Sequence, residues 1–314
     1  SKRQMVEIAR ALSTDARVLI MDEPTSALTA REIQDLFQII RQLRDEGRGI
    51  IYISHRLEEL QHIVDRVTVL RDGKHIRTME WQDTSLPEII SLMVGRDIKE
   101  KFPRVESVRG KPIFEVHGLN AGRLVRDVSL TLYEGEILGI AGLVGAGRTE
   151  TTRAIVGVEP KDSGRLVLDG QEIRINKPMD AIRQGVVLVP EDRKRDGLCV
   201  KLSVTSNVEL PNLDIVSTPA GVVRVRQVAD MVKKAISNLS IRLPGPHVDA
   251  ASLSGGNQQK VVVGKWLARN SRVVIFDEPT RGIDVAAKVE IYHLMNQLKQ
   301  QGIGVMFISS EMPE

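Results

Sequence analysis

The sequence predicts an α/β fold in which helices cover a mostly parallel sheet. Short apolar runs of β-forming residues alternate with longer helical patterns, one run leads directly into a glycine-rich turn, and one segment of 59 residues occurs twice. Alternation of this kind favours parallel strands, because each parallel crossover needs a dozen or more residues and a helix supplies them. The buried-strand candidates of the later half are residues 136–142, 186–190, 272–276 and 305–309.

The composition is that of an ordinary globular protein, with 42% hydrophobic and 27% charged residues. The formal net charge of +3 does not indicate nucleic acid as a partner, since such proteins concentrate basic residues on one face. The only cysteine, Cys199, excludes an internal disulfide framework and fits a reducing compartment. No run approaches the roughly 18 apolar residues that cross a bilayer, and no signal peptide is visible.

The first and last 59 residues are two copies of one segment. Residues 1–59 and 256–314 align without a gap at an offset of 255, with 17 identities. RVLIMDEPTSALT aligns with RVVIFDEPTRGID, which indicates a duplication. The second copy has upstream sequence that the first lacks, and the chain begins at Ser1, so we expect a fragment whose first copy is truncated.

Between the copies, a charged stretch divides the chain. Residues 57–65 have a helical pattern, and 67–79 predict two short strands about an Asp72–Gly73 turn. A further helix is expected to begin after Thr84 or Ser85 and to end at Gly95.

These patterns predict three parts. Residues 1–95 form the first domain, and 96–112, charged and with two prolines, form a linker. Residues 113–314 form the second domain, in which about 192–255 have few strand signals and are expected to contribute helices.

The stretch GLVGAGRT, residues 142–149, follows a strand candidate and nearly matches the phosphate-binding pattern G-x-x-x-x-G-K-[ST]. In such a loop, backbone N–H groups and the positive end of the next helix hold phosphate oxygens, and the Thr149 hydroxyl is available to Mg²⁺. Arg148 stands in the lysine position and keeps its charge, but as a broad planar fork that fits the phosphates less well. The residues expected to bind the nucleotide are Gly142, Leu143, Val144, Gly145, Ala146, Gly147, Arg148, Thr149 and Glu150.

Two acidic residues directly follow the strand candidate 272–276. A parallel strand delivers Asp277 and Glu278 to the carboxyl edge of the sheet, where ligands gather. We expect Asp277 to hold Mg²⁺ through water and Glu278 to polarise a water for attack on a γ-phosphate.

A third motif, LSGGNQQK at 253–260, precedes a helical run. The hydroxyl of Ser254 and the backbone N–H groups at Gly255 and Gly256 predict an anion cradle at the start of that helix.

In this order the motifs resemble those of the ATP-binding cassette (ABC) family, and the resemblance covers essentially the whole chain. GLVGAGRTE, PEDRKRDGL, LSGGNQQK, DEPTRGID and ISSEMPE occur in the second half, and MDEPTSALT and ISHRLEE in the first. This layout is similar to the double-cassette ATPases of bacterial monosaccharide importers of the ribose, galactose, xylose or arabinose type. Importers of the signal autoinducer-2 share it.

The resemblance implies a P-loop NTPase fold with two cassettes, the first truncated. Each cassette has a mostly parallel sheet, a helical subdomain and small antiparallel β elements. The implied cofactors are ATP and Mg²⁺. The implied partners are membrane permease subunits and, indirectly, an extracytoplasmic sugar-binding protein, at the cytoplasmic face of the bacterial inner membrane.

The resemblance further implies that two cassettes, from one chain or from a homodimer, pack head to tail. Each ATP then lies between one glycine loop and the LSGG of the other cassette. One site would consist of Asp22 as a metal-binding residue, Glu23 and His55 as catalytic residues, and Ser254, Gly255 and Gly256.

The other site, built on the glycine loop, departs from the family pattern. Arg148 replaces lysine, Ser310 aligns with His55, and Glu191 stands where a glutamine normally senses Mg²⁺. No aromatic residue lies between Ala121 and Leu124 to stack on adenine. We therefore expect nucleotide binding there with poor hydrolysis or none.

Two other interpretations stay open. A soluble tandem cassette protein acting on ribosomes or DNA usually carries a long charged linker or a zinc insertion, neither of which this sequence has. An inactive fragment is the other, and we expect weak ATPase activity from this polypeptide alone. The loop PEDRKRDGL is expected either at the edge of the permease-docking groove or as a solvated loop.

Overall fold

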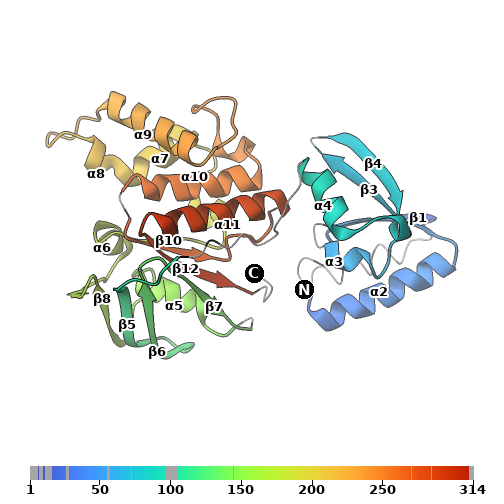
Figure 1. Cartoon of the computed structure of the whole chain (residues 1–314), viewed down its shortest axis with the longest axis horizontal. Coiled ribbons are helices and arrows are strands. Elements are labelled where there is room, and N and C mark those ends of the chain that lie inside the picture. Colours follow the sequence, from blue (N-terminus) through green and yellow to red (C-terminus); the bar gives the residue numbers. More distant parts are fainter. Residues whose placement is uncertain are drawn as a thin grey trace. The chain divides into compact units, whose positions relative to one another are not determined.

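The computed structural model describes residues 6, 10, 16–25, 28–54, 57–71, 73–95, 105, 107–143, 145–269, 271–283 and 285–310. The chain divides into two compact units, residues 1–100 and 101–314, and each is described by itself (Figure 1). His55 and Val144, both expected at nucleotide sites, lie outside the described residues. Within the described ranges, no helix has the length and apolar character that crossing a membrane requires.

The first unit is built on two parallel strands, β1 (Val18–Asp22) and β2 (Gly49–Ile53), joined by helix α2 (Ala30–Asp45). A capping box begins α2: the Glu32 carboxylate accepts from the Thr29 N–H at 2.7 Å, and the Thr29 hydroxyl accepts from the Glu32 N–H at 3.4 Å. The helix buries Leu36, Phe37 and Ile40 against Met21 of β1.

After β2 come α3 (Leu57–Leu60), the antiparallel pair β3 (Arg66–Arg71) and β4 (Lys74–Glu80), the short 3-10 helix η1 (Trp81–Asp83) and α4 (Leu86–Val94). The predicted hairpin is confirmed, although Asp72 of its turn lies outside the described residues.

The predicted helix ending at Gly95 is confirmed as α4. The Ser85 hydroxyl accepts from the Glu88 N–H, and Gly95 ends the helix with a φ of 76° in the left-handed region. The predicted helix over 57–65 is wrong beyond Leu60, because tight hydrogen bonds such as His62 N–H to the Glu59 carbonyl turn the chain toward β3.

One face of the β1–β2 pair carries exposed apolar side chains. They are 59%, 68%, 51% and 48% exposed at Val18, Ile20, Ile51 and Ile53. Parallel sheets are normally covered on both faces. At the matching positions of the second copy, offset by 255, the side chains are fully buried: Val273, Ile275, Met306 and Ile308.

The second unit centres on a parallel sheet of β7 (Ile137–Ala141), β10 (Val186–Val189), β11 (Val273–Asp277) and β12 (Gly304–Ser309), in the order β10-β11-β12-β7. The four predicted buried strands are confirmed. Alternate residues of β11 and β12 enter two separate cores, so the sheet is buried on both faces.

Helices cover one face of this sheet. The main helices are α10 (Gly255–Leu267) and α11 (Val285–Gln300), which lie together above it in Figure 1. The segment 192–255, for which the sequence predicts helices, contains a short π-helix, η2 (Arg193–Gly197), and two 3-10 helices, η3 (Leu210–Asn212) and η4 (Ala250–Ser252). Its α-helices are α7 (Val204–Glu209), α8 (Leu213–Val216) and α9 (Val225–Asn238).

The opposite face is covered by helix α5 (Arg148–Ile155) and by an antiparallel sheet (Figure 1). That sheet has the order β6-β5-β8-β9, from strands β5 (Pro112–Ala121), β6 (Val125–Tyr133), β8 (Ser163–Leu168) and β9 (Gln171–Ile173). The sequence patterns do not predict these strands individually. Helix α6 (Pro178–Arg183) leads from β9 into β10.

Candidate functional site

The glycine loop joins β7 to α5. Gly145 and Gly147 have φ values of 85° and 82°, in the left-handed region that glycine adopts most easily. A Cβ on Gly147 would lie 2.7 Å from the Leu124 carbonyl oxygen, so glycine is also required there by space. A hydrogen bond of 3.0 Å from the Ala146 N–H to the Leu143 carbonyl closes the turn. The loop therefore delivers the chain to the start of α5 at Arg148.

Thr149 in the first turn of α5 contacts the acidic end of β11. Its hydroxyl donates to Asp277 Oδ1 at 3.2 Å. Asp277 is 1% exposed, and burial raises the pKa of its carboxyl to about 6, because loss of water disfavours the charged form. The hydrogen bond from Thr149 lowers this pKa, while the charge of Glu278 raises it.

Arg148 and Ser310 engage both carboxylate oxygens of Glu278. The guanidinium lies 3.4 Å from Oε1, and the Ser310 hydroxyl donates to Oε2 at 3.0 Å. Arg148 also donates to the carbonyl oxygen of Ser309. The side chains of Arg148 and Glu278 are 11% and 10% exposed, so the ion pair is nearly buried. We call Arg148, Thr149, Asp277, Glu278 and Ser310 the carboxylate cluster.

The cluster offers the ligand types that Mg²⁺ prefers. Thr149 supplies a hydroxyl oxygen and Asp277 a carboxylate oxygen, and magnesium is commonly held by one or two carboxylates together with substrate phosphates. Across the described ranges, no group of three or more His, Cys, Asp or Glu residues is placed to hold a metal ion by itself. The residues present fit a metal shared with a nucleotide rather than an all-protein metal site.

Glu191, expected to sense Mg²⁺, lies in the turn after β10 and forms an ion pair with Arg281. Arg281 belongs to the loop that follows Glu278, and its N–H donates to the Glu278 carbonyl at 3.2 Å. Glu191 is thus connected to the carboxylate cluster through this loop, and its ion-pair partner is an arginine.

The LSGG residues lie at the start of α10, with neighbours of their own. Ser254 caps the helix, and its hydroxyl accepts from the Asn257 side-chain amide at 3.0 Å. A Cβ on Gly255 would lie 2.6 Å from a guanidinium nitrogen of Arg193, and one on Gly256 would lie 2.6 Å from the Ala287 Cβ. The structure therefore brings this motif against η2 and α11.

Glu23 of the first unit has the same backbone geometry as Glu278 of the second unit. Glu23 has a φ of 45° and donates its N–H to the Ile53 carbonyl at 2.8 Å. Glu278 has a φ of 46° and donates to the Ile308 carbonyl at 3.0 Å. Asp22 and Glu23 are exposed, whereas Asp277 and Glu278 are buried.

Sequence reasoning missed the contacts of Arg193, Ser309 and Arg281. Arg193 and Arg281 lie within PEDRKRDGL and DEPTRGID, so their positions marked them as candidate functional residues, but these motifs do not reveal which residues they contact. Ser309 acts through its backbone carbonyl, which no residue pattern reveals.

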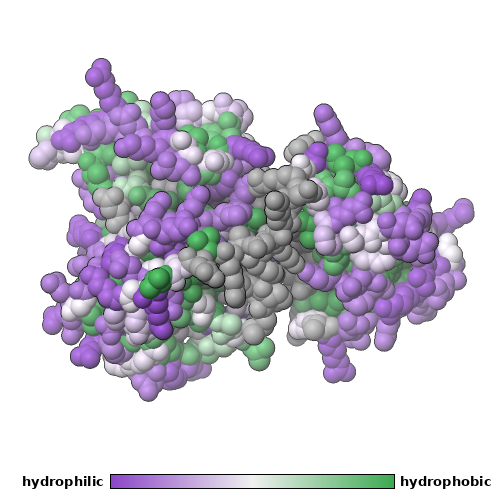
Figure 2. All heavy atoms as spheres, viewed as in Figure 1, coloured by the Kyte–Doolittle hydropathy of each residue, from purple (hydrophilic) through white to green (hydrophobic). Residues whose placement is uncertain are grey.

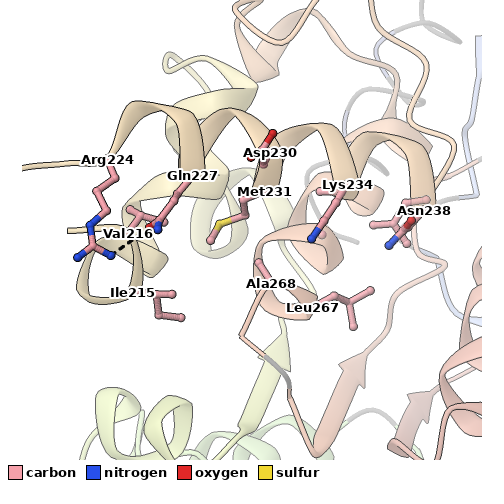
Figure 3. Close-up of a pocket in the computed structure, with 13 residues that line it drawn as sticks. Ile215, Val216, Arg224, Gln227, Asp230, Met231, Lys234, Asn238, Leu267 and Ala268 are labelled. Carbon is pink, nitrogen blue, oxygen red and sulfur yellow. Dashed lines mark hydrogen bonds between the residues drawn. The ribbon is translucent and has the colours of Figure 1, made fainter. Parts of the chain in front are cut away.

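A cavity of about 550 Å³ lies between α8, α9 and the end of α10 (Figure 3), and no residue of the carboxylate cluster lines it. Its rim has both signs of charge, from Arg224, Asp230 and Lys234. Hydrophobic side chains are exposed in the α8–α9 region at Ile215, Val222 and Val225, within a largely hydrophilic surface (Figure 2). The mixed rim favours no particular ligand, and we assign the cavity no function.

Replacing Asp277 by asparagine is expected to stabilise the ligand-free chain at pH 8. The folded-state pKa of about 6 exceeds the ordinary 3.8, so ionised Asp277 destabilises the fold above pH 6 and the cost vanishes below about pH 4. Asp277→Asn should raise the free energy of unfolding at pH 8 by about 1–3 kcal/mol and leave it unchanged below pH 4. Urea unfolding at both pH values measures this.

The control is Asp230→Asn, an exposed carboxyl in α9, which should change little at either pH. A less stable Asp277→Asn variant at pH 8 would contradict the assignment of Asp277 as a buried carboxyl destabilised by its charge.

Comparison with known proteins agrees with this geometry. A protein-family model described as ABC transporter matches residues 125–281. The chain is 52% identical over 312 residues to the putative ribose/galactose/methyl galactoside import ATP-binding protein 1 of Agrobacterium fabrum, covering 99% of this chain and 62% of that protein. It is 48% identical over 313 residues to the ribose import ATP-binding protein RbsA of Geobacillus kaustophilus, covering 100% of this chain and 63% of that protein.

The chain thus spans about three fifths of the length of these curated relatives. Among solved structures, it is similar to the ADP conformation of MJ1267, an ATP-binding cassette of an ABC transporter, with a TM-score of 0.53 and 21% identity over 64% of this chain and 82% of that one. The predicted P-loop NTPase fold of an ABC cassette is confirmed, and the chain belongs to the ABC transporter family.

Proposed function

We propose that this chain is part of the ATP-binding subunit that energises import of a monosaccharide through a separate membrane permease. The observation that carries the proposal is the carboxylate cluster beside the glycine loop. It occurs in a chain with 52% and 48% sequence identity to proteins named for ribose and galactose import. Closure around ATP would drive the permease, since a ligand shifts a conformational equilibrium by its differential affinity for the two states.

The sugar would be ribose, galactose, xylose or a related monosaccharide. The proposed partners are the permease subunits and, through them, an extracytoplasmic sugar-binding protein. The proposed location is the cytoplasmic face of the bacterial inner membrane, where the subunit is peripheral.

In the second unit, the glycine loop would hold the phosphates of ATP, and Thr149 and Asp277 would hold Mg²⁺. Bound magnesium would neutralise charge on the phosphate oxygens. Binding a cation there favours the ionised form of Asp277, so it would release a proton below about pH 6.

Hydrolysis at this site is proposed to be weak or absent. A general base needs a free carboxylate oxygen within reach of the attacking water. Both oxygens of Glu278 are engaged, one by Arg148 and one by Ser310. The site would bind ATP without cleaving it, because the ion pair with Arg148 would keep Glu278 from acting as the general base.

The first unit is proposed to be part of a further cassette, in which Asp22, Glu23 and His55 serve another ATP. Its bare apolar strand face supports this, because the equivalent face of the second unit is covered by α5 and the antiparallel sheet. The shared positive φ and shared hydrogen bond of Glu23 and Glu278 support it as well.

Equilibrium dialysis with labelled ATP and Mg²⁺ tests the nucleotide site. The wild-type chain should bind ATP, and Gly147→Ala should weaken binding at least about tenfold, because the added Cβ meets backbone at 2.7 Å where φ is 82°.

Gly170→Ala is the matched control, since Gly170 has a φ of 79° and open space around the added Cβ. No ATP uptake by the wild-type chain, or equal affinity in Gly147→Ala, would overturn the proposed site.

Deleting the gene that encodes this chain tests the transport role. Uptake of at least one labelled sugar among ribose, galactose and xylose should fall at least about tenfold, because the permease loses its energy source. A plasmid copy of the intact gene should restore uptake. Unchanged uptake of all the monosaccharides tested would argue against sugar import.

A further inference from the structure

The Arg193 side chain joins three segments of the second unit. Its Nε donates to Gln258 Oε1 at 3.3 Å, which reaches α10. Its two terminal nitrogens donate to the carbonyls of Arg281 at 3.2 Å and Gly282 at 3.3 Å, which reach the loop after Glu278. The residue itself begins η2, two positions after Glu191. One guanidinium therefore connects the turn after β10, the start of α10 and the loop after β11.

Surrounding contacts hold this guanidinium in place. Gln258 is 2% exposed, and its amide donates to the Ala250 carbonyl at 3.0 Å, which fixes the acceptor that Arg193 uses. Glu191 forms an ion pair with Arg281 beside it, which makes a second link between the same turn and loop.

Gly255 leaves room for the guanidinium. A Cβ there would lie 2.6 Å from its NH2 nitrogen, so this glycine of the LSGG motif serves Arg193 as well as any anion in the cradle. The absence of a side chain at Gly255 has a structural reason independent of ligand approach.

We propose that Arg193 is a positioning residue that fixes the LSGG cradle relative to the loop that leaves the carboxylate cluster. The proposal rests on the proposed nucleotide-binding function. The guanidinium places a side-chain amide oxygen and two carbonyl oxygens on three separate nitrogens, Nε and both terminal nitrogens. A lysine ammonium also has three donors, but all on one nitrogen, so it cannot reproduce that geometry.

This arrangement gives a physical route between two phosphate-binding elements. The loop from Glu278 to Gly282 begins at the carboxylate cluster, and Ser254 and Gly255 begin the anion cradle. A shift of Glu278 when ATP binds at the glycine loop would move the carbonyls of Arg281 and Gly282. Arg193 would transmit that movement to Gly255 and Gln258, so that occupancy of one ATP site changes the cradle that serves the other.

Amide hydrogen exchange read by mass spectrometry on the whole chain, with and without ATP and Mg²⁺, tests the proposal. Without nucleotide, Arg193→Gln should exchange at least about tenfold faster than wild type in residues 253–258 and 280–283, because hydrogen bonds holding both segments are lost. Strands β11 and β12 should exchange as in wild type.

With ATP, wild type should gain protection at residues 253–258. Arg193→Gln should bind ATP with an unchanged dissociation constant but gain no protection at residues 253–258. General destabilisation of the fold would not produce this combination. Arg193→Lys should recover the effect only in part. Lys194→Gln, an exposed neighbour with the same loss of charge, should behave as wild type.

The proposal fails if Arg193→Gln exchanges like wild type at 253–258 without nucleotide, or keeps the ATP-induced protection there. If the wild-type chain binds no ATP, the proposed function fails instead, and the nucleotide-free comparison still decides whether Arg193 positions the cradle.

Discussion

The nearly buried ion pair between Arg148 and Glu278 determines what this site can do. It joins the first residue of α5 to the end of β11, two points separated by 130 positions in the sequence, and the strand order β10-β11-β12-β7 makes that contact possible. Ser310, which directly follows β12, engages the second carboxylate oxygen, so α5, β11 and β12 are joined at one side chain. In a phosphate-binding loop that matches the full pattern, the same position carries a lysine with its compact ammonium. Here a longer, planar cation reaches across the loop to the carboxylate instead.

Asp277, the neighbouring carboxyl, differs from Glu278 in its environment. Asp277 is buried and accepts a hydrogen bond from the Thr149 hydroxyl, and its pKa rises to about 6, so the ligand-free site holds a carboxyl that is costly to ionise. A cation brought in with a nucleotide would remove that cost. The cluster therefore combines one carboxylate paired with an arginine and one that a metal would stabilise in its ionised form. This combination supports the proposal that the site retains ATP rather than cleaving it.

Much of this arrangement could be predicted from local patterns. Apolar runs gave the strands of the parallel sheet, and Ser85 and Gly95 gave the limits of α4, since caps and glycine C-termini are local signals. The antiparallel strands β5, β6, β8 and β9 were not predicted individually. The pairings of β5 with β6 and with β8 shift register at irregular positions, which breaks the strict alternation that marks a strand, and β9 has only three residues. The helix predicted over residues 57–65 was too long, since periodicity alone does not show where turn hydrogen bonds replace helical ones. The glycine loop and acidic residues were recognised by spacing. The partners of Arg148, Ser310 and Arg193 depend on long-range packing, so they could not be predicted from the sequence.

The most direct test of this account is a double-mutant cycle on Arg148→Ala, Glu278→Ala and the double variant, measured by urea unfolding at pH 7. If the pair is formed as described, the two changes should be coupled by about 1–3 kcal/mol, because removing either partner leaves a nearly buried charge without its counterion. Effects that add to within about 0.5 kcal/mol would show that Arg148 does not hold Glu278, and the proposal of weak hydrolysis at this site would lose its physical basis.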